Sequence, residues 1–283
     1  MKVTHNIQET RRILAALTVE KRVGLVPTMG ALHDGHASLI RQSVVENDFT
    51  VISIFVNPLQ FGEHEDLDKY PVTLDADAEL AESLGVDLVF NPNAREILGE
   101  RMLTFVDIEE LQTTLCGASR PGHFRGVCTI VSKLFNIIQP HNAYFGEKDI
   151  QQLIIIERMV KDLNIPVNIV PCPLVREPDG LAMSSRNSYL SPEERQQALV
   201  LNRAIGRAVQ LYREGERSAD ILIREAETLI QSAPAAAIDY VQIVDRDLKD
   251  VERVHEDSIL ALAVFIGETR LIDNHMMQRP FLL

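Results

Sequence analysis

The chain contains no tryptophan and only three cysteines among its 283 residues, and aromatic residues make up 5% of it. Cys116, Cys128 and Cys172 are widely spaced and form no CxxC pair, which excludes the usual zinc-cluster and dithiol motifs. We expect reduced, mostly buried thiols without a chemical role.

Long apolar runs are also absent. No stretch approaches the roughly 20 apolar residues that span a bilayer, and residues 1–10 lack the apolar core of a signal peptide. A cytoplasmic location is therefore expected. The net charge of −13 argues against nucleic acid or an anionic membrane as a partner, because both attract positive surfaces. The apolar fraction of 46% is enough for a sizeable core.

Short apolar segments alternate with helical patterns over the first part of the chain. The expected strands are 23–27, 50–56, 87–90, 142–145 and 167–170, and the expected helices are 11–17, 37–47, 74–84, 127–138 and 150–163. This alternation, with strands apolar along their length, predicts an α/β domain with a doubly wound parallel sheet.

The pattern changes after residue 175. Prolines and a glycine cluster at 171–180, and Ser191-Pro192-Glu193-Glu194 is a strong helix start. A long helix from there, a second helix at 218–231 and strands at 240–244 and 259–266 predict a smaller α+β domain. We expect one domain at 1–175 and another at 176–283.

The segment PTMGALHDGH (residues 27–36) lies between the first of these strands and the next helix. Ligands of open α/β sheets bind beyond the carboxyl ends of the strands, and a helix N-terminus favours phosphate. His33 and His36 can both donate hydrogen bonds to phosphate oxygens there. The HxGH pattern therefore indicates a nucleotide site; a strand–turn–helix corner with incidental histidines is the alternative. GxxxxGKS/T and GxGxxG motifs are lacking, so P-loop and ordinary dinucleotide chemistry have no support.

Two further segments supply groups for phosphate. Met183-Ser184-Ser185-Arg186-Asn187 offers hydroxyls and a bidentate guanidinium. Gly146-Glu147-Lys148-Asp149 follows a strand; Lys148 can neutralise phosphate, and Asp149 can hold ribose or a metal, or simply cap the helix.

Two other segments offer further candidate binding groups. Asn57 and Gln60 follow the second strand as neutral amides, unless they form only a polar turn, and the acidic loop 62–69 beside them is a candidate lid. Arg120 and His123, with Arg125, form a positive patch before a helix, unless they merely pair with surface acids.

Together these segments resemble the pantothenate synthetase family, also called pantoate–β-alanine ligases. The matching stretches are VPTMGALHDGH (26–36), SIFVNPLQF (53–61), GASRPGHFRGV (117–127), FGEKDIQQL (145–153) and LAMSSRNSYL (181–190). The resemblance implies a Rossmann-like domain of the class I aminoacyl-tRNA synthetase type, a smaller C-terminal domain and a homodimer. It also implies that ATP adenylates (R)-pantoate, releasing pyrophosphate, and that β-alanine then displaces AMP.

The resemblance further implies roles by position. Gln60 and Gln152 match pantoate-binding glutamines, Gln60 also lies beside β-alanine, and His36 matches the proton donor. The implied nucleotide-binding residues are Met29, Gly30, Ala31, Leu32, His33, Asp34, Gly35, His36, Gly146, Glu147, Lys148, Asp149, Val175, Met183, Ser184, Ser185 and Arg186.

A carboxylate is already a nucleophile at neutral pH, so the protein has only to align it with the α-phosphate and absorb charge on pyrophosphate. We expect His33, His36, Lys148, Ser184, Ser185 and Arg186 to do so with Mg²⁺, whose protein ligands the sequence does not identify. Two alternatives remain: adenylyl transfer to a phosphorylated substrate, and a nucleotide-binding module without catalysis.

Overall fold

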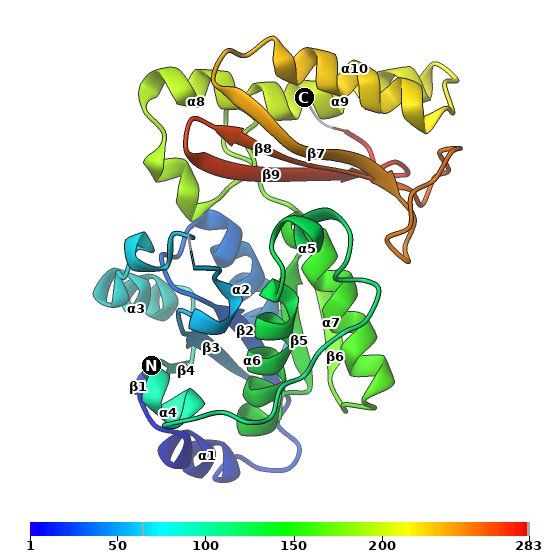
Figure 1. Ribbon diagram of the computed structural model, residues 1–283. Helices are drawn as coiled ribbons and strands as arrows, with labels where there is room; N and C mark the ends of the chain where they lie inside the picture. Colours follow the sequence, from blue (N-terminus) through cyan, green and yellow to red (C-terminus); the bar gives the residue numbers. More distant parts are fainter. Residues whose placement is uncertain (64, 282–283) are drawn as a thin grey trace. The chain divides into compact units, whose positions relative to one another are not determined.

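The chain forms two compact units in the computed structural model, which describes residues 1–63 and 65–281. The first unit comprises residues 1–109, 120–147 and 155–173, and the second comprises residues 110–119, 148–154 and 174–283 (Figure 1). The division expected between residues 175 and 176 stays a prediction. Among the described residues, no helix has the length and apolar character needed to cross a membrane.

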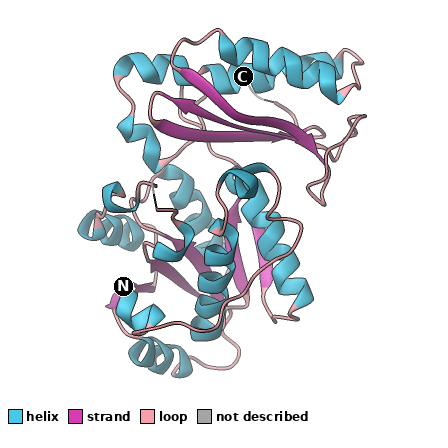
Figure 2. Cartoon of the chain, viewed as in Figure 1, coloured by secondary structure: helices cyan, strands magenta, loops and turns pink. Residues whose placement is uncertain are grey.

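The described residues of the first unit contain a six-stranded parallel sheet in the order β1-β4-β3-β2-β5-β6. Figure 2 draws the strands in magenta and the helices in cyan. The bounds are β1 Lys2–Thr4, β2 Val23–Thr28, β3 Phe49–Ile54, β4 Leu88–Phe90, β5 Asn142–Gly146 and β6 Asn168–Cys172. This confirms the predicted doubly wound parallel class. The short edge strand β1 was not expected, and β3 ends at Ile54, two residues before the predicted end at 56.

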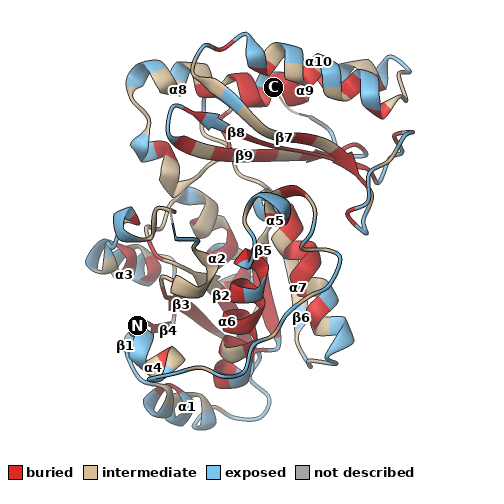
Figure 3. Ribbon diagram, in the orientation of Figure 1, coloured by how far each residue is buried: buried red, intermediate tan, exposed pale blue. Residues whose placement is uncertain are grey.

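Helices cover the sheet, as the apolar strands predict. Their bounds are α1 Ile7–Ala15, α2 Asp34–Glu46, α3 Leu74–Ser83, α4 Ala94–Leu98, α6 His123–Ile138 and α7 Ile150–Asp162. Val26 of β2 and Ile52 of β3 pack in one cluster with Ile40 of α2. The alternate residues Leu25 and Val51 point to the opposite face and are also fully buried. Figure 3 colours much of the sheet as buried. Each such side chain stabilises the fold by about 1.5–3 kcal/mol.

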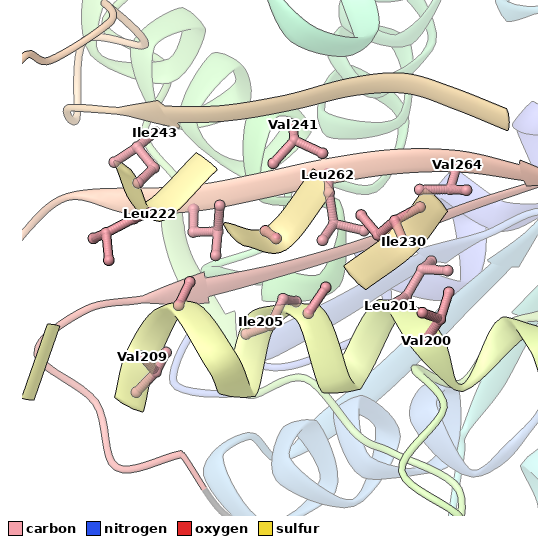
Figure 4. Packing of buried hydrophobic residues seen from close by; sticks show 14 of the residues in the cluster. Val200, Leu201, Ile205, Val209, Leu222, Ile230, Val241, Ile243, Leu262 and Val264 are labelled. Carbon is pink, nitrogen blue, oxygen red and sulfur yellow. The ribbon is translucent and has the colours of Figure 1, made fainter. Parts of the chain in front are cut away.

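Within the described residues, the second unit contains a three-stranded antiparallel sheet, β7 Ala236–Val244, β8 Ile259–Ile266 and β9 Thr269–Met276. Apolar residues on one face of this sheet, such as Val241 and Leu262, pack against α9 Val200–Arg213 and α10 Ala219–Gln231 (Figure 4). The unit also contains α5 Leu115–Ser119. The expected smaller α+β unit is therefore present.

One expectation for this part of the chain was wrong, and one strand was not expected. The helix that starts after Ser191, with the predicted capping box and Pro192 at its first position, ends at Ala198 as α8 Pro192–Ala198. The chain turns at Leu199 before α9 begins, so the predicted long helix is two helices. Strand β9 was not expected, because its polar residues at 270 and 273–275 hide the strand pattern.

His275 of β9 is buried, and its Nε2–H donates to the carbonyl oxygen of Arg279. Burial lowers the pKa of His275 to about 4. Because this value lies below that of an unfolded histidine, about 6.5, the folded chain favours the neutral ring; stability is complete above about pH 6.5 and falls as the pH drops toward 4.

We therefore expect this residue to lower the free energy of unfolding by up to about 3 kcal/mol between pH 7 and pH 4. Urea unfolding of the wild type and of His275→Gln at both pH values measures the effect. The variant should lose less free energy of unfolding between pH 7 and pH 4 than the wild type does. An equally large loss in the variant would show that His275 does not cause the pH dependence.

Candidate nucleotide and substrate site

The strand order places two of the predicted nucleotide segments, the HxGH turn and Gly146-Glu147, at one point of the first unit's sheet. From β2 the chain proceeds outward through β3 and β4, whereas β5 pairs with β2 on its other side and leads to β6. The order therefore reverses between β2 and β5, and ligands of such sheets bind beyond the strand ends at this reversal. His33 and His36 of the HxGH turn (residues 27–36) lie beyond the end of β2, and Glu147 directly follows Gly146, the last residue of β5.

The two histidines of the HxGH turn cap the helix that follows them. Nδ1 of His33 accepts from the backbone N–H of Gly35 at 3.1 Å, and Nδ1 of His36 accepts from the backbone N–H of His33 at 3.3 Å. The ring centroids lie 4.1 Å apart. A neutral imidazole that accepts at Nδ1 carries its proton on Nε2. The reciprocal cap therefore makes both Nε2–H groups donors at the N-terminus of α2.

A residue that the sequence analysis missed holds the loop before these histidines. The carboxylate of Asp77, on α3, accepts from the backbone N–H of Ala31 at 3.0 Å and of Leu32 at 2.8 Å. Asp77 is only 3% exposed. Gly30 and Ala31 both have positive φ, 87° and 50°, so the buried carboxylate stabilises a strained turn. A Cβ at Gly30 would also lie 2.9 Å from this carboxylate, which explains the glycine.

The amides predicted to bind substrate lie next to the same loop. The Nε2 of Gln60 is 3.2 Å from the sulfur of Met29, and Nδ2 of Asn57 donates to Oε1 of Gln60 at 2.9 Å. Asn57 is buried and also donates to the carbonyl oxygen of Gly126. A Cβ at Gly126 would lie 2.2 Å from the carbonyl oxygen of Leu59, so only glycine permits this close approach. Asn57 therefore orients Gln60.

Arg120 and His123 of the predicted positive patch contact this group, but Arg120 is paired with a carboxylate. Arg120 donates from Nε to Glu65 at 2.7 Å and forms a second contact with the same carboxylate. Arg120 and the Nδ1 of His123 both contact the carbonyl oxygen of Gln60, at 3.2 and 2.8 Å. Burial raises the pKa of Glu65, but Arg120, together with a backbone hydrogen bond from Gly62 and the nearby His123, lowers this pKa overall. Glu65 thus ties the candidate lid 62–69 to the patch.

The remaining predicted residues lie in the second unit. Lys148 forms an ion pair with Asp149 at 3.7 Å, and Gln152 lies near the start of α7, partly exposed. Met183 N–H donates to the carbonyl oxygen of Val175 at 3.0 Å, closing the hairpin that leads into Ser184. The Oγ of Ser184 accepts from Arg186 N–H at 3.3 Å and caps the short 3₁₀ helix Ser185–Tyr189.

The structure thus gathers the predicted residues into two sets. Met29, Asn57, Gln60, Arg120 and His123 form a connected group in the first unit, together with the HxGH turn. Lys148, Asp149 and Gln152, on one segment, and the hairpin with Val175 and residues 183–186 belong to the second unit.

An open parallel sheet with capped histidine donors at its reversal point defines an α/β protein of the HxGH nucleotidyltransferase class. The family model described as pantoate-beta-alanine ligase matches residues 2–276. The chain belongs to this family, and it is an enzyme, a ligase of pantoate and β-alanine.

Individual relatives agree. The chain is 51% identical over 278 residues to a pantothenate synthetase of Pseudothermotoga lettingae, covering 98% of this chain and 99% of the relative. The pantothenate synthetase of Thermus thermophilus superposes with a TM-score of 0.93 at 44% identity, covering 98% and 99% of the two chains. The Francisella tularensis pantoate-beta-alanine ligase, solved with an ATP ligand and β-alanine, superposes with a TM-score of 0.82 at 35% identity over both whole chains.

Proposed function

We propose that this chain activates the carboxylate of (R)-pantoate with ATP, releases pyrophosphate, and transfers the pantoyl group from AMP to the amine of β-alanine. The observation that carries the proposal is the reciprocal cap of His33 and His36, which presents two Nε2–H donors at the end of β2. These donors suit the charge that grows on departing pyrophosphate.

The first step needs alignment and charge stabilisation more than covalent chemistry. A pantoate carboxylate oxygen attacks the α-phosphorus while the bond to the pyrophosphate oxygen breaks. We assign pantoate to Gln60 and Gln152 and the nucleotide to residues 29–36, 146–149, 175 and 183–186. His36 is the principal donor to the phosphates, and His33, Lys148, Ser184, Ser185 and Arg186 share the remaining charge.

Mg²⁺ fits this site as a companion of ATP. Among residues 1–63 and 65–281, no group of three or more His, Cys, Asp or Glu side chains is arranged to hold a metal. Mg²⁺ commonly binds one or two carboxylates together with substrate phosphates. Asp149, with a side chain 48% exposed, is a suitable carboxylate. When bound, the ion neutralises phosphate charge.

The second step requires β-alanine to present a neutral amine to the acyl carbon, so that the C–N bond forms as the C–O bond to AMP breaks. We assign the carboxylate of β-alanine to Arg120, with His123 and Asn57 holding Gln60 beside it. In the structure the carboxylate of Glu65 accepts from the guanidinium of Arg120. The substrate carboxylate takes the place of this internal one.

Arg120→Ala is accordingly expected to raise KM for β-alanine by about tenfold or more, because a charge-assisted hydrogen bond to a carboxylate contributes about 1.5–3 kcal/mol. Adenylate formation without β-alanine should change less than about twofold. Steady-state kinetics of this variant checks the assignment. Glu65→Gln, measured beside it, removes the competing charge and should lower the KM for β-alanine. An unchanged KM in Arg120→Ala would exclude Arg120 from the β-alanine site.

We also propose a homodimer, as the family resemblance implies, and a cytoplasmic location. Burial raises the pKa of both Cys128 and Cys172 to about 12, which keeps them as inert thiols and suits a reducing compartment. Light scattering of the purified chain tests the dimer.

Pantoate-dependent exchange of labelled pyrophosphate into ATP, without β-alanine, tests the proposed function. We expect exchange with (R)-pantoate and none without it. Exchange supported instead by a phosphorylated acceptor would favour the other HxGH chemistry, and ATP binding without exchange would indicate a binding module.

A further inference from the structure

Strand β9 carries two consecutive polar residues, Asp273 and Asn274, that hold different segments of the second unit. β9 is an edge strand of the sheet, and it pairs Asp273 with Leu262 and Asn274 with Ala261 of β8. Successive residues of a strand point to opposite faces. One strand therefore reaches two neighbouring segments from opposite sides.

Asp273 binds the hairpin that leads to residues 183–186. Its carboxylate accepts from both terminal nitrogens of Arg176 at 2.7 and 2.9 Å, and its side chain is 1% exposed. Arg176 also donates to the carbonyl oxygen of Gly180 at 3.0 Å. Arg176 directly follows Val175 and forms a bridge with Ala182 across the hairpin. The ion pair therefore fixes the base of this hairpin to β9.

Asn274 binds the other nucleotide segment of the unit. Its Nδ2 donates to the carbonyl oxygen of Lys148 at 2.8 Å. This contact holds the backbone from which the Lys148 ammonium projects. Lys148 and Asn274 are 126 positions apart in the chain, so no local pattern anticipates the contact.

We propose that Asp273 and Asn274 are positioning residues of the ligase, which set Lys148 and residues 183–186 at a fixed separation around the phosphates of ATP. This inference rests on the nucleotide roles assigned above. Replacing a buried ion pair by apolar residues is often neutral or stabilising, so the Arg176–Asp273 pair is poorly explained by stability alone. Its geometry, bidentate to an arginine beside Val175, fits a role in placing the hairpin.

The test compares Asp273→Asn and Asn274→Ala with wild type by pantoate-dependent pyrophosphate exchange and by thermal unfolding. A misplacement of about 1 Å costs up to about 100-fold in rate. We expect kcat to fall about tenfold in Asn274→Ala and about 10- to 100-fold in Asp273→Asn. KM for ATP should rise in both, while KM for pantoate stays within about twofold, a split that general destabilisation does not produce.

Asp239→Asn is the matched control. Asp239, with a side chain 16% exposed, accepts from Arg270 of β9 and from the Oγ of Ser119, both at 2.7 Å; among the described residues neither contact involves Lys148 or residues 183–186. The control should keep wild-type kcat and KM for ATP. Equal losses in Asp239→Asn and Asp273→Asn, or wild-type kinetics in Asp273→Asn and Asn274→Ala, would overturn the proposal.

Lys148→Ala and Arg186→Ala, assayed in parallel, separate this inference from the site assignments. Strong losses of activity in these two variants, with wild-type kinetics in Asp273→Asn and Asn274→Ala, would overturn the positioning proposal and leave the assigned nucleotide site unchanged. Full activity of Lys148→Ala and Arg186→Ala would overturn the assigned nucleotide roles, and the positioning proposal with them.

Discussion

Replacing His36 with alanine is expected to lower turnover by about 100- to 1000-fold, the loss typical of removing one preorganised donor to developing charge. The physical reason lies in the cap. Because Nδ1 of His36 is held by the backbone N–H of His33, its Nε2 carries the proton and is oriented before ATP arrives. Quenched-flow measurement of adenylate formation gives this rate directly.

His33→Ala is the comparison for helix stability, since it removes the other half of the same cap, together with a donor that we assign only a share of the phosphate charge. Each variant loses one side-chain acceptor at the start of α2, which costs about 1 kcal/mol of stability. Similar unfolding midpoints with a much larger kinetic loss in His36→Ala would separate chemistry from helix stability. A loss below about threefold would remove His36 from the mechanism.

Asp77→Ala is expected to reduce pyrophosphate exchange by about 100-fold, although Asp77 acts on the histidine donors only through the loop that it holds. The substitution leaves the partly buried backbone N–H groups of Ala31 and Leu32 without their carboxylate. It therefore costs about 2–3 kcal/mol of stability and releases a turn with two positive φ angles. Exchange should be measured well below the unfolding midpoint, with ATP and pantoate varied separately.

Asp75→Ala provides the comparison for this prediction. Asp75 lies on the same helix, α3, and its substitution removes the same charge, but its side chain is exposed. We expect wild-type exchange and little change in stability. If Asp77→Ala retained half of the wild-type rate, the carboxylate would have no positioning role.

Much of the first unit was predictable because parallel strands buried on both faces are apolar along their length. Val23–Thr28 and Asn142–Gly146 stand out in this way, and the HxGH turn follows the first of them. Strand β9 was not predictable, because its buried polar residues Asp273 and His275 break the apolar pattern. They are tolerated because they form hydrogen bonds with residues outside the strand. The break between α8 and α9 at Leu199 was not predictable either, because no residue that disfavours a helix precedes it.

The residues of the site were predictable only where their own side chains carry the chemistry. Motif residues such as His36 and Gln60 carry their chemistry in their own side chains. Asp77 acts through backbone groups 45 positions away, and its sole sequence signal is an acid at an apolar-face position of the helix 74–84. The pairing of Arg120 with Glu65 arises from chain segments 55 positions apart, which no spacing rule connects.

The central claim, that pantoate is activated at the α-phosphate of ATP, is tested most directly with pantoate labelled with ¹⁸O in its carboxylate. Attack on the α-phosphorus followed by displacement with β-alanine leaves one carboxylate oxygen on AMP. Mass spectrometry of the products should therefore find one ¹⁸O atom in AMP and none in pyrophosphate. Unlabelled AMP, with the label in phosphate or pyrophosphate, would contradict activation through a pantoyl adenylate.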